Sequence, residues 1–300
     1  MSTRDSDPDF GDADAIADVL HRCAERNRND ERRRGASIHL PAAGTLTITG
    51  DLHDHGPNLD RILRLARLEA GPDRHVVLHE LIHGENFVND ADLSVRTLAR
   101  VAALKLRFPG QVHLMQSNHE LAQLKGEGIY KGDIAVVDAF DQGVEDLYPG
   151  KADEVHEAVR DYVESLPLCV RVAPPGDADR GLFVAHSLPA PRRIEAFDKS
   201  VIDRVPTDAD LSPKGSAYDM VWGRHHNRKI TGELAEAWGV SVFLLGHQPA
   251  DFGYETVADN ALVLASDHAN GVAVVLDLTR EWTRDEVVEA ITVLNEVPGG

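Results

Sequence analysis

The stretch His75–Asp90, HVVLHELIHGENFVND, decides how the rest of this sequence is interpreted. It contains His79-Glu80-Leu81-Ile82-His83, which matches the H-E-x-x-H pattern. On a helix, this pattern puts two imidazoles on one face, with a glutamate beside them that activates a zinc-bound water. At the end of a strand, the same residues belong to a different kind of hydrolytic site. The two interpretations require different residues elsewhere, so the remaining chain decides between them.

Length, charge and cysteine content exclude several classes of protein. A chain of 300 residues buries most of its apolar surface without disulfides, and its two cysteines, Cys23 and Cys169, fit a reducing cytoplasm as the expected location. The first residues are acidic where a signal peptide needs basic and apolar ones, and no apolar run is long enough to span a bilayer, so no membrane partner is expected. The net charge of −19 argues against nucleic acid as the main partner.

Strands, polar turns and helices alternate along much of the chain. Apolar periodicity predicts helices over about 12–28, 59–68, 91–106, 230–238 and 283–294, and a hairpin formed by 261–265 and 272–276 around the turn SDHANG. The acidic residues 1–12 predict a disordered tail. We expect a single domain over residues 13–300, with a helical insertion at about 121–165.

Potential metal ligands follow five of the predicted strands. The strand ends carry Asp51/His53, Glu80/His83, Asn118/His119, His186 and His247. Carboxylate, amide and imidazole groups are ligands for divalent metals, and two neighbouring ions need a carboxylate that reaches both. A lone strand-end histidine or turn aspartate is more often structural. Five in succession, each after an apolar run, indicate a metal site.

The order of these motifs resembles that of the calcineurin-like metallophosphoesterases, and within them the phosphoprotein-phosphatase type. That family shows D-x-H, then G-D-x-x-D-R-G, then G-N-H-E, then two histidines that each follow a later strand. The counterparts here are Asp51-Leu52-His53, His79–Gly84, Asn118-His119-Glu120, His186 and His247. The resemblance spans about residues 45–278. It implies an α/β fold, namely a four-layer αββα metallophosphoesterase sandwich with a helical insertion.

The same resemblance implies a metal-dependent phosphoester hydrolase with two metal ions, of manganese, iron or zinc. It assigns Asp51, His53 and His247 to one ion, Asn118 and His186 to the other, and Glu80 to the bridging position. His119 would protonate the leaving oxygen of a phosphorylated protein or small molecule, while metal-bound hydroxide attacks phosphorus. His79 replaces a glycine of the family and is not expected to be a ligand. The sequence leaves the oligomeric state open.

Three departures from the family pattern affect the expected activity. Glu80 is one methylene longer than the family's aspartate, and His83, which replaces the aspartate that orients the catalytic histidine, brings no fixed charge. Gly84 stands where the family has a phosphate-binding arginine. Arg224 and Arg228 are candidate replacements, because a guanidinium binds phosphate oxygens in pairs. These changes are compatible with weakened or altered phosphatase activity.

Two alternatives remain open at the level of sequence. A zinc protease would use His79, Glu80 and His83, but Gly84 would weaken the required helix by about 1 kcal/mol relative to alanine. The protease hypothesis also leaves the other strand-end motifs unexplained. A catalytically degenerate binding protein on the phosphoesterase fold is the second alternative, and it is motivated by the substitutions at positions 80, 83 and 84.

Overall fold

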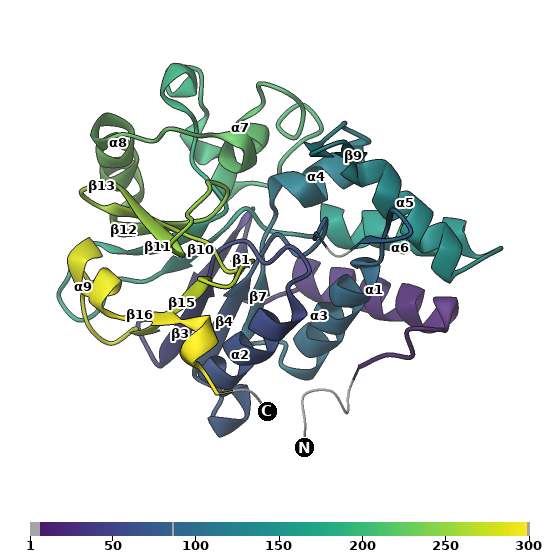
Figure 1. Cartoon of the computed structure of the whole chain (residues 1–300). Coiled ribbons are helices and arrows are strands. Elements are labelled where there is room, and N and C mark those ends of the chain that lie inside the picture. Colours follow the sequence, from purple (N-terminus) through teal and green to yellow (C-terminus); the bar gives the residue numbers. More distant parts are fainter. Residues whose placement is uncertain (1–6, 86, 299–300) are drawn as a thin grey trace.

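Two sheets packed face to face form the centre of the computed structural model, which describes residues 7–85 and 87–298 (Figure 1). The larger sheet contains, in spatial order, β1 (Arg33–Arg34), β2 (Ser37–Leu40), β10 (Cys169–Val172), β11 (Gly181–Ala185), β12 (Val240–Leu245), β14 (Ala261–Leu264) and β13 (Tyr254–Ala258). The smaller sheet contains β16 (Ile291–Val293), β15 (Val272–Asp277), β3 (Thr45–Thr49), β4 (Arg74–Leu78) and β7 (Val112–Leu114). Two short hairpins lie outside these sheets: β5 (Phe87–Val88) with β6 (Ala91–Asp92), and β8 (Tyr130–Lys131) with β9 (Ile134–Ala135).

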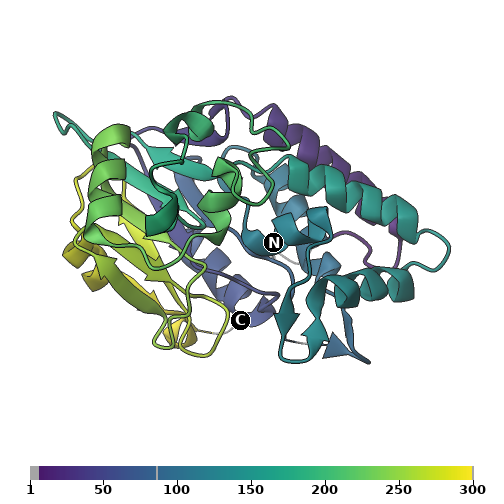
Figure 2. The same cartoon turned by 90° about the horizontal axis from the view of Figure 1, so that it is seen from above.

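Helices cover the outer face of each sheet. The smaller sheet shares a core with α1 (Ala13–Arg28), α2 (Gly56–Ala66), α3 (Val95–Arg107), α5 (Val136–Leu147) and α6 (Ala152–Glu164). The larger sheet packs against α7 (Ser216–Trp222) and α8 (Arg228–Trp238). The remaining helices are α4 (Asn118–Lys125), α9 (Arg284–Glu289) and 3₁₀ turns over Leu68–Ala70, Pro191–Arg193, Lys199–Asp203 and Leu294–Glu296. Figure 2 shows α1 and α6 side by side at the outer edge, in purple and teal.

Apolar side chains fill the space between the two sheets. Ile48 of β3 and Val274 of β15 meet Leu244 of β12 and Leu264 of β14 there, and all four are buried. These strands are covered on both faces. β14 and most of β12 accordingly read as continuous apolar runs, whereas β3 alternates threonine with leucine and isoleucine although four of its five residues are buried. The order of helix, sheet, sheet and helix confirms the predicted four-layer αββα sandwich.

Two predictions about the C-terminal part were wrong. The expected hairpin does not form, because β14 pairs with β12 and β13 in the larger sheet whereas β15 pairs with β3 and β16 in the smaller one. Both strands are apolar on both faces, so their pattern contains no information about register or partner. The helix expected over 283–294 ends at Glu289, and the β-branched residues of β16 join the sheet instead.

The N-terminal segment lies only partly within the described chain. Of the tail expected over residues 1–12, residues 1–6 lie outside the described residues. Phe10 packs against the helical core, and its carbonyl accepts a hydrogen bond of 3.1 Å from the Tyr148 hydroxyl. Among residues 7–85 and 87–298, no helix has the length and apolar character needed to cross a membrane.

The two sheets come closest at the carboxyl end of β3. A Cβ atom on Gly50 would lie 2.0 Å from the Leu264 carbonyl oxygen, so only glycine permits this approach. Immediately afterwards, Asp51 forms an isolated parallel bridge with Ala265. The carboxyl ends of strands from both sheets therefore meet at one place.

A buried ion pair ties α3 to the segment after α1. Lys105 Nζ donates to Asp30 Oδ2 at 2.8 Å and to the Pro109 carbonyl at 2.9 Å, and both charged residues are buried. Burial opposes ionisation of Asp30, but the charge and hydrogen bond of Lys105 outweigh it and lower the pKa of Asp30. We expect Lys105→Ala to lower the free energy of unfolding by about 3–5 kcal/mol, because it leaves a buried carboxylate unpaired.

Chemical denaturation of Lys105→Ala tests this expectation. The matched control is the double variant Lys105→Met/Asp30→Leu, which removes both charges. Its free energy of unfolding is expected to be much closer to that of the unsubstituted protein than the value for Lys105→Ala. Equal losses for the single and double variants would show that packing, not the unpaired charge, governs the effect.

Candidate metal centre

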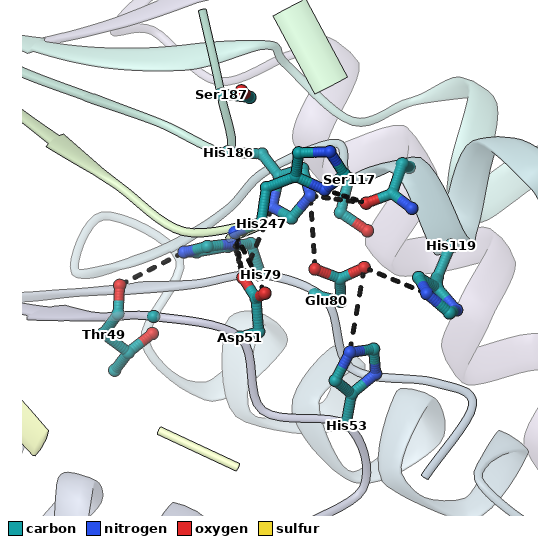
Figure 3. Close-up of polar contacts among 12 residues, drawn as sticks. Thr49, Asp51, His53, His79, Glu80, Ser117, His119, His186, Ser187 and His247 are labelled. Carbon is teal, nitrogen blue, oxygen red and sulfur yellow. Dashed lines mark hydrogen bonds and ion pairs between the residues drawn. The ribbon is translucent and has the colours of Figure 1, made fainter. Parts of the chain in front are cut away.

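Five strand-to-loop junctions place polar side chains around one point. Asp51 follows β3, Glu80 follows β4, and Asn118 begins α4 just after β7, all from the smaller sheet. His186 follows β11 and His247 follows β12 of the larger sheet. Figure 3 shows Asp51, Glu80, His186 and His247 converging, with His53 and His119 completing the cluster. Asn118 joins them through Oδ1, which lies 2.7 Å from His186 Nε2 and 2.8 Å from His247 Nδ1. The structure therefore brings together the predicted metal ligands and the predicted catalytic histidine.

The carboxylate of Glu80 lies at the centre of this cluster. It is 1% exposed, and among the described residues neither oxygen has a hydrogen-bond partner. Three imidazole Nε2 atoms surround it, at 3.2 Å for His186, 3.7 Å for His119 and 4.0 Å for His53 (Figure 3). A buried carboxylate without hydrogen bonds is costly, and a bound cation would compensate that cost.

His79 determines which nitrogen of His186 carries the proton. His79 Nε2 lies 3.1 Å from the Thr49 carbonyl oxygen, which only accepts, so Nε2 is the protonated nitrogen of a neutral His79. Its Nδ1 lies 3.0 Å from Nδ1 of His186 and therefore accepts a hydrogen bond from the His186 Nδ1–H. His186 Nε2 is then a bare lone pair that faces Asn118 Oδ1 at 2.7 Å and Glu80 Oε2 at 3.2 Å. When Glu80 is ionised, three acceptors meet here without a hydrogen between them, as in a cation site.

His247 lies with Asn118 and His186, and not with Asp51 and His53 as expected from the sequence. Its Nδ1 is 2.8 Å from Asn118 Oδ1, the oxygen that also faces His186. Only its backbone N–H reaches Asp51, at 2.9 Å from each carboxylate oxygen. The difference arises because the chain turns at His247, so the main chain and the ring point to different sides of the cluster.

Several cluster residues occupy a strained backbone conformation. His53, Glu80 and His247 have φ values of 40°, 50° and 68°, in the left-handed region that non-glycine residues rarely adopt. Position 246, just before His247, requires glycine. A Cβ atom there would lie 2.2 Å from Asp51 Oδ1 and 2.6 Å from His79 Cε1. Such strain concentrates at functional sites, where the surrounding structure holds it in place.

Burial shifts the pKa values of the cluster in opposite directions. Desolvation raises the pKa of Asp51 to about 7, and burial together with the neighbouring Asp51 raises the pKa of Glu80 well above its usual value. Desolvation lowers the pKa of His53 and His247 to about 3. At neutral pH, these imidazoles are neutral, which is the form that binds a metal ion. The donor set of carboxylates, an amide oxygen and neutral imidazoles therefore fits divalent cations.

A second chain of hydrogen bonds orients His119. The Nδ1 atoms of His119 and His83 lie 2.9 Å apart, and His83 Nε2 lies 2.9 Å from Gln123 Oε1. The Gln123 amide in turn donates to Asp141 Oδ1 at 2.7 Å, which fixes the amide with its oxygen toward His83. His83 Nε2 must therefore be protonated, so His83 Nδ1 accepts a hydrogen bond from the Nδ1–H of His119. The unprotonated Nε2 of His119 then faces Glu80. His83 thus contacts the nitrogen of His119 that faces away from Glu80, and its orienting role stays a prediction.

Glu120 supports the loop that carries Glu80. Its Oε1 accepts a hydrogen bond of 2.7 Å from the backbone N–H of Leu81, and its other oxygen accepts one from the Ser117 hydroxyl. The side chain is 1% exposed. The third residue of the Asn118-His119-Glu120 motif thus positions the neighbouring loop.

The two arginines considered for phosphate binding have different surroundings. Arg224 Nε donates to His247 Nε2 at 3.1 Å and therefore lies at the cluster. Arg228 is the first residue of α8; its side chain is 85% exposed and its guanidinium pairs with Asp259 at 2.5 Å. Within the described chain, no hydrogen bond or ion pair joins Arg228 to the cluster. Sequence reasoning missed Lys131, which lies outside the family motifs, and it gave no orienting role to His79, which replaces the glycine of one motif.

The protease hypothesis fails on local structure. After β4 ends at Leu78, residues 79–85 form a loop and not a helix, and both Glu80 and His83 have positive φ. His79 faces His186 and Asp51, whereas His83 faces His119 and Gln123. Two imidazoles that point to different partners cannot hold the single zinc ion that the H-E-x-x-H pattern requires.

Comparison with known proteins agrees with the geometry. No protein-family model matches the chain. It is 26% identical over 231 residues to a probable serine/threonine-protein phosphatase of Encephalitozoon cuniculi, covering 72% of this chain and 45% of that protein. It is 23% identical over 208 residues to the serine/threonine-protein phosphatase 6 catalytic subunit of Drosophila melanogaster. That match covers 69% of this chain and 58% of that protein. The chain thus spans about half the length of the curated relatives that it matches.

Solved structures resemble it in fold. A protein serine/threonine phosphatase from Saccharomyces cerevisiae with similarity to human phosphatase PP5 aligns with a TM-score of 0.64 at 14% identity, over 88% of this chain and 82% of that one. A cold-active protein-tyrosine phosphatase of a psychrophilic Shewanella species aligns with a TM-score of 0.55 at 12% identity, over 85% of this chain and 80% of that one. At these identities the likeness concerns the fold alone.

Proposed function

We propose that the chain is a member of the calcineurin-like metallophosphoesterase superfamily, since its sequence relatives are named serine/threonine-protein phosphatases, and that it hydrolyses phosphomonoesters with the help of two metal ions. The observation that carries this proposal is the buried Glu80 carboxylate, which lies without hydrogen bonds among three imidazoles. In the absence of a cation, this carboxyl group bears the full cost of its desolvation, and a bound metal ion would offset that cost.

The proposed ligands fall into two overlapping groups around Glu80. We propose that Asn118, whose Oδ1 faces both His186 and His247, holds one ion together with these two histidines. Asp51 and His53, which both follow β3, would hold the other. Manganese, iron and zinc all accept this mixture of oxygen and nitrogen ligands. When bound, such ions lower the pKa of water and neutralise phosphate oxygens.

His119 supplies the proton that the leaving oxygen needs. Its Nε2 faces the centre at 3.7 Å from Glu80 Oε1, while its Nδ1 is held by His83. Burial lowers the pKa of His119 far below its usual range in the free protein. A phosphate dianion beside Nε2 favours the protonated imidazole, so substrate binding promotes protonation of this acid. His83 accepts a hydrogen bond from His119 Nδ1 but carries no negative charge. We therefore propose weaker activity than in a site where an aspartate accepts this hydrogen bond.

The substrate class follows from the relatives and from the surroundings of the site. The curated relatives are named serine/threonine phosphatases, and we propose a phosphoprotein or a small phosphomonoester as the substrate.

We further propose that residues 13–300 form one domain in which the segment 121–165 is an insertion that borders the site. A cytoplasmic location is also proposed, and it is supported by two buried, unpaired thiols, Cys23 and Cys169. Cell fractionation tests it.

Metal analysis combined with a phosphatase assay tests the function. Protein purified without chelator and reloaded with manganese, iron or zinc is expected to bind two ions per chain and to release phosphate from 4-nitrophenyl phosphate. Chelation is expected to abolish turnover, and re-addition of metal to restore it. Two bound ions without any phosphoester turnover would identify a degenerate binding protein, and failure to bind any metal would refute the proposal.

A further inference from the structure

Position 84 cannot carry the phosphate-binding arginine expected from the family pattern. A Cβ atom on Gly84 would lie 2.7 Å from the His53 carbonyl oxygen and 2.8 Å from Asp54 Cβ. A side chain at this position would therefore push against the loop that holds His53. The site needs its cation from another part of the chain.

The β8–β9 hairpin brings a cation to this side of the cluster. Lys131, the last residue of β8, donates from Nζ to the His83 carbonyl oxygen at 2.8 Å. Its charge acts on Glu80, Asp51, His53 and His119, so the ammonium lies within electrostatic range of both proposed metal positions. Burial lowers the pKa of Lys131, whereas the charges of Glu80, Asp267 and Glu85 oppose that change. The hairpin therefore places a partly buried positive charge beside the centre.

The ammonium group has capacity for a further ligand. Within the described chain, its one hydrogen bond is to a neutral carbonyl, and no salt bridge to Lys131 is present. An ammonium has three hydrogens, so two remain for other acceptors. Metal ions would neutralise Glu80 and Asp51, which would leave the ammonium of Lys131 able to attract an incoming phosphate, with Asp267 and Glu85 as the other carboxylates that act on it.

Resting on the proposed function, we propose that Lys131 binds the substrate phosphate and replaces the arginine that Gly84 excludes. Arg224 lies on the side of His247, whereas Lys131 lies on the side of His83. The two cations thus approach the centre from different loops. Since Lys131 belongs to a short hairpin between α4 and α5, phosphate recognition here depends on a segment that lies outside the strand-end motifs.

Substitution by glutamine separates the charge of Lys131 from its structural hydrogen bond. Lys131→Gln keeps an N–H that can reach the His83 carbonyl but removes the charge. We expect it to weaken binding of inorganic phosphate to the metal-loaded protein by about 10- to 100-fold, as for loss of a charge-assisted hydrogen bond. The Michaelis constant for 4-nitrophenyl phosphate should rise in parallel, with metal content and melting temperature unchanged. Lys131→Arg should stay within a few-fold of the unsubstituted protein.

A matched control comes from the preceding helix. Lys125→Gln makes the same chemical change at a lysine whose carboxylate contact, at 3.4 Å, is Asp208, and it is expected to leave phosphate affinity unchanged. Unchanged phosphate affinity in Lys131→Gln with full metal content would overturn the proposal, as would a loss fully explained by lower metal content. If the unsubstituted, metal-loaded protein neither binds nor releases phosphate, it is the proposed function that fails.

Discussion

Replacement of His119 by alanine is expected to lower the turnover of phenyl phosphate by about 10²–10⁴-fold, the usual contribution of a general acid. Metal binding should persist, because His119 is not one of the proposed metal ligands. Its hydrogen bond among the described residues is to His83, which is not a proposed ligand either. The loss should be smaller for 4-nitrophenyl phosphate, whose leaving oxygen is less basic and needs less protonation. Steady-state kinetics on both substrates and metal analysis of the same preparation measure the effect.

The dependence on leaving group separates proton donation from a merely structural role. A damaged site would lose turnover equally on both substrates, and that outcome, or a loss of metal, would contradict the assignment of His119. His21→Ala is a suitable control, because the His21 side chain is 44% exposed and its ion pair is with Asp161 on the adjacent α6. It should leave both rates unchanged.

The sequence could predict which residues meet, but not how each one is oriented. Asp51, Glu80 and Asn118 follow parallel neighbouring strands, and the carboxyl ends of such strands lie at one edge of a sheet. His247 is different, since its ring and its backbone N–H point to different groups after a turn with positive φ. Sequence spacing contains no information on that choice, so it could not decide whether the ring of His247 faces Asp51 and His53 or, as in the structure, Asn118 and His186.

Residues that act through three-dimensional contacts were harder to foresee. His79 stands at a position where the family has glycine, and its effect on His186 depends on the Thr49 carbonyl of a neighbouring strand. Lys131 lies in a segment predicted to be mostly helical, yet it forms a short hairpin that reaches the His83 loop. Arg228 was a candidate by composition alone, and the start of α8 directs it toward Asp259.

The second large effect concerns Glu80. Glu80→Gln removes the one charged group that can bridge both proposed metal positions, so we expect metal affinity to fall by more than about 100-fold, beyond the loss typical of outer-shell changes. Phosphatase activity should be lost with it. Titration calorimetry with manganese or zinc measures the affinity. Glu85→Gln is the matched control on the same loop, because Glu85 is exposed, and it should retain metal affinity.

The same substitution should stabilise the metal-free protein. The folded-state pKa of Glu80 is raised above its ordinary value of 4.5, so the folded state binds more protons, and its stability falls as pH rises above about 4.5. Glutamine avoids this penalty, because its amide carries no charge at any pH. With chelator at neutral pH, Glu80→Gln should therefore melt at a higher temperature than the unsubstituted protein, and with saturating metal at a lower one. If the order of melting temperatures does not reverse on adding metal, Glu80 is not the bridge between the ions.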